Sequence, residues 1–239
     1  MQKFLVFGFH PDDIEYCCCA TVAKVIKQGH KVVYCIVTNG DKGVNGKKSH
    51  IAIKIRQKEQ KESARIVGVD KLIFLNEVDG ELENTKELRK KLVAVIRSEK
   101  PEIIMTFEPY SHFDDLYAMH RDHREGTMAV FDAAYPASCT PSYFPELLKK
   151  GLEPHSIKEF WFYAPTRPNY FINIASVLNL KIQALASHMS QVKTHEIAKE
   201  IKEFAAMMGR PKKIKYAEAF RRVNMDYKDI NNYRVFPYC

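Results

Sequence analysis

Two short stretches of this sequence collect side chains that can bind a metal ion or transfer protons. FHPDDIEYCCCA, residues 9–20, contains one imidazole, three carboxylates and three consecutive thiols. HRDH places His120 and His123 three residues apart, which makes them neighbours on one face if the segment is helical. Imidazole and carboxylate groups from separate segments, with water in the fourth position, are typical of an open catalytic zinc site. The chemistry to test is metal-assisted hydrolysis.

Each stretch also has a simpler structural explanation. Pro11 and Asp12 suit the start of a helix, where an Asp can cap the first N–H groups and an acid is favoured by the helix dipole. An isolated His-x-x-His is most often a solvated helix start. These explanations leave His10 and the second acid, Asp13, without a role. The combination of the two stretches therefore carries more weight than either one.

The three adjacent cysteines are less promising than they look. In a helix that runs on from Asp13, consecutive side chains point about 100° apart, so Cys17, Cys18 and Cys19 cannot converge on one ion. We expect them to be small buried packing residues. Six cysteines in a chain of this size do not form a disulfide scaffold either, and we expect reduced thiols.

The elements that must position these residues alternate between apolar strands and helices. This alternation predicts an α/β fold, Rossmann-like and doubly wound, with a mostly parallel sheet and helices on both faces. The strands are expected at 3–9, 30–39, 71–75, 101–109, 158–165 and 169–174. The helices are expected from Asp12 to Gly29, at 53–67, at 85–99, from near His120 onward, and at 176–191 and 196–208. The region 135–154 is expected to be an excursion over the rim of the sheet.

In open parallel sheets, ligands bind outside the carboxyl ends of the strands. Segments 10–13, 38–43, 76–79 and 108–123 all follow predicted strands, so we expect them to share one rim. The long connections 107–119 and 135–156 are where we expect substrate specificity to lie. Their aromatic residues could stack on a ring of the substrate: Tyr110, Phe113, Tyr117 and Tyr143.

Length and composition are those of a soluble, folded chain. At 239 residues and with no linker-like segment, we expect a single domain, 1–239. No apolar run is long enough to span a membrane and no signal peptide is recognisable, so the expected location is the cytoplasm. The net charge of +8 is spread over helices and mixed with Glu, which favours a solvated basic face over a nucleic-acid partner.

With these motifs in view, the chain resembles the zinc-dependent N-acetylglucosaminyl deacetylases, the LmbE-like or PIG-L-like family. HPDDIE and HRDH resemble its two His- and Asp-containing signatures. TNGDKG, RQKEQKESARIVGV, FLNEVDGEL, LASHMSQ and AEAF resemble further family segments in the expected order. Two departures are Arg121, where Pro is usual, and the CCCA segment, where the family is rich in Gly. Neither removes a proposed ligand.

The resemblance implies a role for seven residues. It implies His10, Asp13 and His123 as zinc ligands. It implies Asp12 as general base and His120 as the residue that stabilises the oxyanion or assists as acid. It implies contacts of Arg56 and Asp79 with sugar hydroxyls.

The function that the resemblance implies is removal of the N-acetyl group from a GlcNAc-containing sugar or glycoconjugate, with release of acetate. His and Asp ligands would also accept Fe²⁺ or Co²⁺ in place of Zn²⁺. The expected partner is a small sugar. The resemblance also implies a possible homo-oligomer, a trimer or a hexamer. The alternatives are an amide hydrolase for another small-molecule conjugate and a non-enzymatic Rossmann-like protein that binds nucleotide or nucleic acid. The second is disfavoured because FHPDD replaces a glycine-rich turn.

Overall fold

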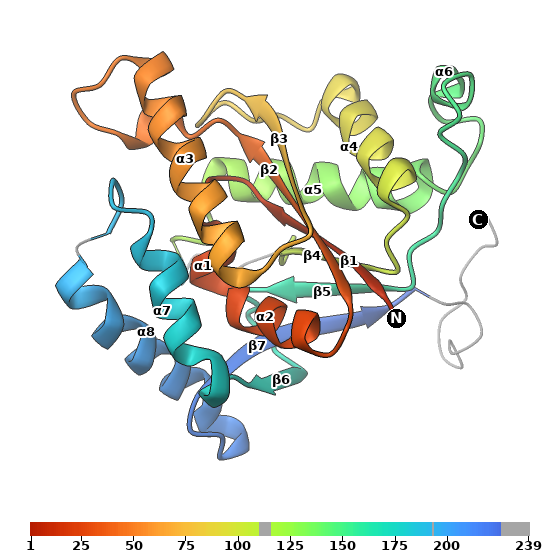
Figure 1. Ribbon diagram of the computed structural model, residues 1–239. Coiled ribbons are helices and arrows are strands. Elements are labelled where there is room, and N and C mark those ends of the chain that lie inside the picture. The colour runs from red at the N-terminus through yellow and green to blue at the C-terminus, as the bar shows by residue number, and fades with distance from the viewer. Residues whose placement is uncertain (110–115, 193, 226–239) are drawn as a thin grey trace.

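The fold is built on a seven-stranded sheet with helices packed on both faces (Figure 1). The computed structural model describes residues 1–109, 116–192 and 194–225. The strand order is β3-β2-β1-β4-β5-β7-β6. The first five strands of that order pair in parallel, whereas β7 is antiparallel to both β5 and β6. The predicted doubly wound, mostly parallel α/β fold is confirmed.

The strands and helices have the following bounds. The strands are β1 Lys3–Gly8, β2 Lys31–Thr38, β3 Lys71–Glu77, β4 Ile103–Phe107, β5 Glu159–Tyr163, β6 Tyr170–Asn173 and β7 Ala217–Asn224. The helices are α1 Asp13–Cys17, α2 Cys19–Lys27, α3 Ser49–Val67, α4 Lys86–Glu99, α5 Arg121–Asp132, α6 Pro145–Leu148, α7 Leu178–Ala186 and α8 Thr194–Gly209. Short 3-10 turns lie at Asp41–Gly43, Ala175–Val177 and Arg210–Lys212, and a π-turn at Ala133–Ala137.

The central strands are buried on both faces because helices cover the sheet from both sides. The β1 residues from Phe4 to Gly8 and all five β4 residues are buried, as is expected for parallel strands that read as continuous apolar runs. The helices α2, α3 and α7 pack against one another on one face, and α4 packs against α5 on the other (Figure 1).

The direction of winding reverses between β1 and β4. From β1 the chain moves to β2 and β3 on one side, and then crosses to β4 and β5 on the other. A crevice opens at such a switch point, outside the carboxyl ends of the strands. The loop after β1 and the start of α5, which hold the two stretches of chemically active residues, flank this switch point.

The single helix predicted from Asp12 to Gly29 is wrong in one respect, because it is broken at Cys18. The backbone of Cys18 has φ −147°, which ends α1 and starts α2. The backbone groups that the break leaves without a helical partner bind a buried ion pair from the C-terminal part of the chain. Lys181 Nζ donates to Tyr16 O over 2.7 Å and to Glu218 Oε1 over 2.6 Å. Glu218 accepts the amide hydrogens of Ala20 and Thr21 at the start of α2.

The excursion after α5 is held by one buried arginine on α4. The Arg97 guanidinium is fully buried and donates to backbone oxygens of Ala137, Ser138, Thr140 and Tyr143. Because the pairing is with carbonyl groups of a single segment, Arg97 acts as its anchor. Strand β7 is the one element of the described sheet that we did not predict.

The cysteines are mostly buried, as expected. Cys18, Cys19 and Cys35 are buried free thiols, and burial raises their pKa values. Cys139 is disulfide-bonded, which corrects at that position the expectation of reduced thiols.

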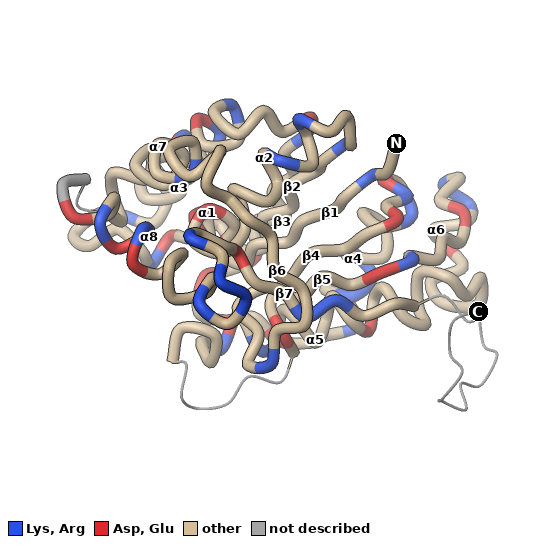
Figure 2. Tube along the Cα trace, turned by 90° about the horizontal axis from the view of Figure 1, so that it is seen from below, with Lys and Arg blue, Asp and Glu red and all other residues tan. Residues whose placement is uncertain are grey.

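Acidic and basic side chains are mixed over much of the chain, and Arg210, Lys212, Lys213 and Lys215 form a short basic run after α8. Figure 2 shows Lys and Arg interspersed with Asp and Glu, and the sequence of α8 alternates the two signs. Within the described part of the chain, none of the helices combines the length and apolar character that crossing a membrane requires.

The ion pairs of Glu99 give a testable account of how the amino ends of two strands are held. Glu99, 6% exposed, ends α4 and binds Lys3 of β1 and Lys71 of β3 over 2.8 and 2.6 Å. Burial alone would raise the pKa of Glu99, but the two lysines hold it below its ordinary value. The stabilisation is therefore present above the ordinary pKa of 4.5 and is lost as the pH falls through the lower, folded-state pKa.

We predict that Glu99→Gln lowers the free energy of unfolding at neutral pH by about 1 kcal/mol, because the lysines are partly solvated. Denaturant unfolding at neutral pH and near pH 3 should show the difference from the native sequence shrinking at the lower pH. Glu62→Gln, which removes an exposed pair with Arg65, is the control and should change little. An undiminished difference at the lower pH would contradict the assignment.

Candidate active site

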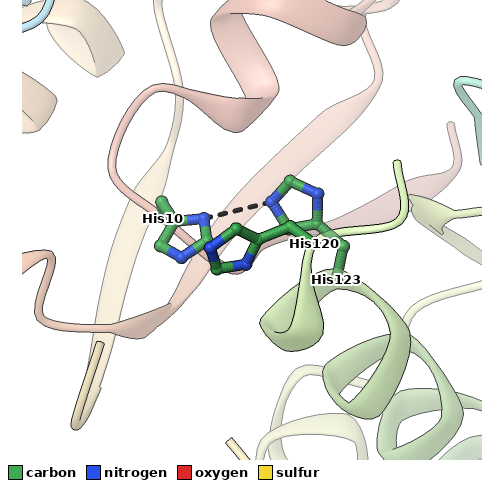
Figure 3. Close-up of side chains that lie close together, drawn as sticks. All are labelled: His10, His120 and His123. Carbon is green, nitrogen blue, oxygen red and sulfur yellow. Dashed lines mark hydrogen bonds between the residues drawn. The ribbon is translucent and has the colours of Figure 1, made fainter. Parts of the chain in front are cut away.

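The two stretches singled out in the sequence meet at the switch point between β1 and β4. His10 from the loop after β1 faces His120 and His123 from the start of α5 (Figure 3). The Nδ1 atom of His10 lies 3.1 Å from Nε2 of His123. One ring nitrogen from each of the three histidines lies within 4.8 Å of the others. A single ion could contact nitrogens from both stretches.

Asp13 joins this group through both of its carboxylate oxygens. Its Oδ2 accepts the backbone N–H groups of Phe9 and His10, each over 2.8 Å, and lies 3.6 Å from His10 Nδ1. Its Oδ1 lies 3.3 Å from His123 Nε2 and accepts the Tyr117 hydroxyl over 2.8 Å. The facing nitrogens of His10 and His123 thus lie 3.1 Å apart, and each lies within 3.6 Å of one Asp13 oxygen, Oδ2 for His10 and Oδ1 for His123.

The other nitrogen of His10 is held by two acids. His10 Nε2 lies 3.0 Å from Asp122 Oδ2 and 3.2 Å from Asp79 Oδ1. Asp122 is fully buried and also accepts the amide hydrogens of Gly80 and Leu82. Asp122 thus ties the loop after β3 to the start of α5 and orients His10.

Sequence reasoning gave no role to Asp122. Its position between the two histidines of HRDH was visible, but an acid in the first turn of a helix is sufficiently explained by the helix dipole. Only the spatial contact with His10, 112 residues away in sequence, reveals the role.

His123 is oriented from two sides. Its Nδ1 lies 2.7 Å from the carbonyl oxygen of Tyr117, and its ring stacks on Phe107 with a centroid distance of 4.0 Å. The helix that carries His123 approaches β1 closely because Gly126 has no side chain. A Cβ atom at Gly126 would lie 2.3 Å from the Phe9 ring. Nε2 of His123 is left to face His10 and Asp13.

His120 caps helix α5 and faces the same cluster. Its Nδ1 accepts the backbone N–H of Asp122 over 3.2 Å, so the proton of the neutral ring lies on Nε2. Burial, together with His10 and His123, lowers the pKa of His120. At neutral pH this side chain is thus a neutral hydrogen-bond donor, with its ring centroid 4.8 Å from that of His10.

Asp12 lies in a strained and buried position next to His10 and Asp13. Its backbone φ is 128°, a conformation that residues other than glycine adopt only under constraint from their surroundings. Burial raises the pKa of its carboxyl to about 6, although the Arg56 guanidinium opposes that shift. Asp12 is therefore a carboxylate with enhanced basicity.

Arg56 and Asp79, expected to contact sugar hydroxyls, both lie against the candidate site. Arg56 Nη2 donates to Pro11 O over 2.5 Å and lies 3.4 Å from Asp12 Oδ2. Asp79 Oδ2 accepts the amide hydrogen of Lys42 over 3.1 Å. Their contact with a sugar stays a prediction.

The aromatic residues expected to stack on a ring of the substrate are dispersed. Tyr117 reaches the site, where its hydroxyl binds Asp13. Tyr143 instead lines a separate hollow of about 550 Å³ beside α4 and α6. Tyr110 and Phe113 lie outside the described residues.

The ionisation of the cluster suits the binding of a cation. Burial alone would lower the pKa of His10, but Asp13 and Asp122 raise it well above its ordinary value. Burial alone would raise the pKa of Asp13, but His123 and His10 hold it well below its ordinary value. In this cluster imidazoles and carboxylates share protons, and a divalent cation can take the place of those protons by binding the same nitrogen and oxygen atoms.

Comparison with solved structures places this site in a fold that hosts more than one reaction. The structure superimposes with a TM-score of 0.87 on N,N′-diacetylchitobiose deacetylase from Pyrococcus horikoshii in complex with its inhibitor MPG. The sequences are 29% identical, with 93% of this chain and 84% of the other covered. GalB, the 4-carboxy-2-hydroxymuconate hydratase of Pseudomonas putida KT2440, shares the fold at a TM-score of 0.78 and 19% identity, with 95% and 98% of the chains covered.

Sequence comparison identifies the family. The diacetylchitobiose deacetylase of Thermococcus kodakarensis is 36% identical over 193 residues, which are 80% of this chain and 70% of that protein. Residues 5–134, which include every residue of the candidate site, match the family model PIG-L, described as GlcNAc-PI de-N-acetylase. The chain belongs to the PIG-L family of deacetylases.

Proposed function

We propose that this protein hydrolyses the N-acetyl group of a GlcNAc-containing sugar or glycoconjugate with a zinc ion held by His10, Asp13 and His123. The observation that carries the proposal is the close grouping of two imidazole nitrogens and the Asp13 carboxylate beside the basic carboxylate of Asp12. The sequence relatives named as diacetylchitobiose deacetylases support the choice of an N-acetyl sugar.

The donor set fits zinc in both geometry and ligand type. Tetrahedral zinc with ligands at about 2.0–2.1 Å has ligand atoms about 3.3 Å apart. The two imidazole nitrogens here are 3.1 Å apart, and the Asp13 carboxylate lies 3.3 Å from the nitrogen of His123 through Oδ1 and 3.6 Å from that of His10 through Oδ2. Each imidazole also has its other nitrogen occupied, His10 Nε2 by Asp122 and His123 Nδ1 by a backbone carbonyl. Such partners fix the ring so that its lone pair points to a metal. Fe²⁺ and Co²⁺ suit the same donors.

A bound zinc ion would polarise the amide carbonyl and lower the pKa of water to about 7. Asp12 would take the proton of the attacking water as the oxygen bonds to the carbonyl carbon. The Nε2–H of His120 would donate a hydrogen bond to the oxyanion that forms. Asp12 would then pass its proton to the amide nitrogen as the C–N bond breaks, which leaves acetate and a free amine.

The positions of Arg56 and Asp79 support a sugar-binding role in this reaction. Each lies within 3.4 Å of a site residue, Arg56 of Asp12 and Asp79 of His10. Hydroxyls of a sugar whose acetamido group reaches Asp12 would thus meet a guanidinium and a carboxylate. This pair would bind the ring by hydrogen bonds and orient it for attack.

Asp12→Asn tests the general base. We expect acetate release from N,N′-diacetylchitobiose or N-acetylglucosamine to fall by roughly 10²- to 10⁴-fold, because an amide cannot accept the water proton. Zinc content should stay at one equivalent, since Asp12 is not a proposed ligand. Glu81→Gln, an exposed acid that pairs with Lys42, is the control and should keep full activity. Full activity of Asp12→Asn would refute the assignment.

Asp122→Asn tests the orientation of His10. The variant replaces the carboxylate that holds the His10 ring by an uncharged amide. Loss of such a partner typically weakens metal binding by about 10- to 100-fold. Competition with a chromophoric chelator measures the zinc Kd. Asp132→Asn, at the far end of the same helix, should leave that Kd unchanged. An unaltered Kd in Asp122→Asn would mean that the ring is oriented by other contacts.

A further inference from the structure

Three buried polar side chains at and around the first turn of α1 have no part in the proposed reaction. Glu15 of α1, Gln60 of α3 and His188 of the turn after α7 are each 0% exposed. We call these three residues the Glu15 cluster. His188 belongs to the LASHMSQ segment, whose presence the site geometry so far leaves unexplained.

The bonds within the Glu15 cluster are incomplete. Gln60 Nε2 donates to Glu15 Oε1 over 3.1 Å, and His188 Nε2 lies 3.5 Å from Glu15 Oε2. Among the described residues, Glu15 Oε2, Gln60 Oε1 and both ring nitrogens of His188 have no hydrogen-bond partner. Buried polar groups are nearly always paired, and leaving them unpaired costs stability. Packing therefore does not account for these residue types at this place.

The Glu15 cluster abuts the turn that carries Asp12. Glu15 lies in the first turn of α1, and the carbonyl oxygen of Asp12 accepts the amide hydrogen of Tyr16 in that turn. Gln60 lies one helical turn after Arg56 on the same face of α3. Arg56 in turn contacts the Asp12 carboxylate.

The turn that carries His188 is fixed to the rest of the protein by other bonds. Ser190 donates from its N–H and its hydroxyl to the Glu59 carboxylate, over 2.8 and 2.7 Å. Gln191 Nε2 donates to Gly43 O over 2.9 Å. These bonds fix the turn at the residues that follow His188, and they can be altered separately from the imidazole.

We propose that His188 is a positioning residue that, through its 3.5 Å contact with the Glu15 carboxylate, fixes the first turn of α1 and so the place of the Asp12 carboxylate relative to Asp13. The strained backbone at Asp12, with φ 128°, needs such a constraint, because strain of this kind persists only where the surroundings over-determine it. The proposal rests on the proposed function in so far as Asp12 is the base.

His188→Leu removes the pairing at similar volume. We expect kcat for acetate release to fall about 10- to 100-fold, the loss typical of a misplaced catalytic group. KM should change by less than about twofold and zinc content should stay at one equivalent, since the Asp13 carboxylate keeps its bonds to Phe9, His10 and Tyr117 and the sugar contacts do not change. His188→Gln, which keeps a donor near the position of Nε2, should recover most of kcat. Native kcat in His188→Leu would overturn the proposal.

Two further variants separate positioning from general damage to the turn. Ser190→Ala loosens the same turn but leaves His188 in place, and it should keep native kcat. In the double variant Glu15→Gln/His188→Leu the loss of kcat should not exceed the larger of the two single losses, because the residues act as one unit. A double variant whose loss is the product of the single losses would show that His188 does not act through Glu15.

Hydrogen exchange gives a readout that does not depend on turnover. In His188→Leu the amides of residues 13–17 should exchange faster than in the native protein, whereas Ser190→Ala should match the native rates there. If the native protein releases no acetate, the proposed function fails while this measurement still decides the positioning role. Unchanged exchange at residues 13–17 in His188→Leu would refute that role.

Discussion

The carboxylate of Asp13 is the interaction on which the rest of the site depends. One oxygen accepts two successive backbone N–H groups, those of Phe9 and His10, and so fixes the turn between β1 and α1. The other faces His123 and Tyr117, which belong to a segment more than 100 residues later. A single buried group thus shapes the loop and joins the two halves of the site. Because both oxygens are occupied by N–H or O–H donors and imidazoles, burial does not prevent the carboxyl from remaining ionised.

The part of the chain that follows the residues matched by the family model supports this turn indirectly. All candidate site residues lie within 5–134, yet the break between α1 and α2 is satisfied by Lys181 and Glu218. Removing one partner of such a buried pair would strand the other charge in the interior, which typically costs about 3–5 kcal/mol. A short α1 that ends at Cys17 lets Asp12 and Asp13 meet the site while α2 packs on the sheet. The C-terminal part is therefore needed for the geometry of an N-terminal site.

The sequence allowed the prediction of the sheet, its winding and the rim, because buried parallel strands read as continuous apolar runs. It also allowed the prediction that His10 and HRDH lie close together, since the two segments follow strands on either side of the switch point. The break at Cys18 was not predictable, because it depends on a Lys–Glu pair 160 to 200 residues away. Asp122 and His188 were missed for a related reason. Each is an ordinary residue for its local element, and only long-range contacts give it a role.

The fold does not by itself determine the reaction, since a hydratase shares it at a TM-score of 0.78. What favours amide hydrolysis here is that neighbouring groups suit different steps of that reaction. Three donors that can hold a cation lie beside a carboxylate whose pKa is raised to about 6, and beside a neutral imidazole with its proton on Nε2. Amide hydrolysis needs a group that takes a proton from water and returns it to nitrogen. Asp12 suits both steps because burial raises its basicity and Arg56 limits the increase, so that the carboxyl can exchange protons near neutral pH.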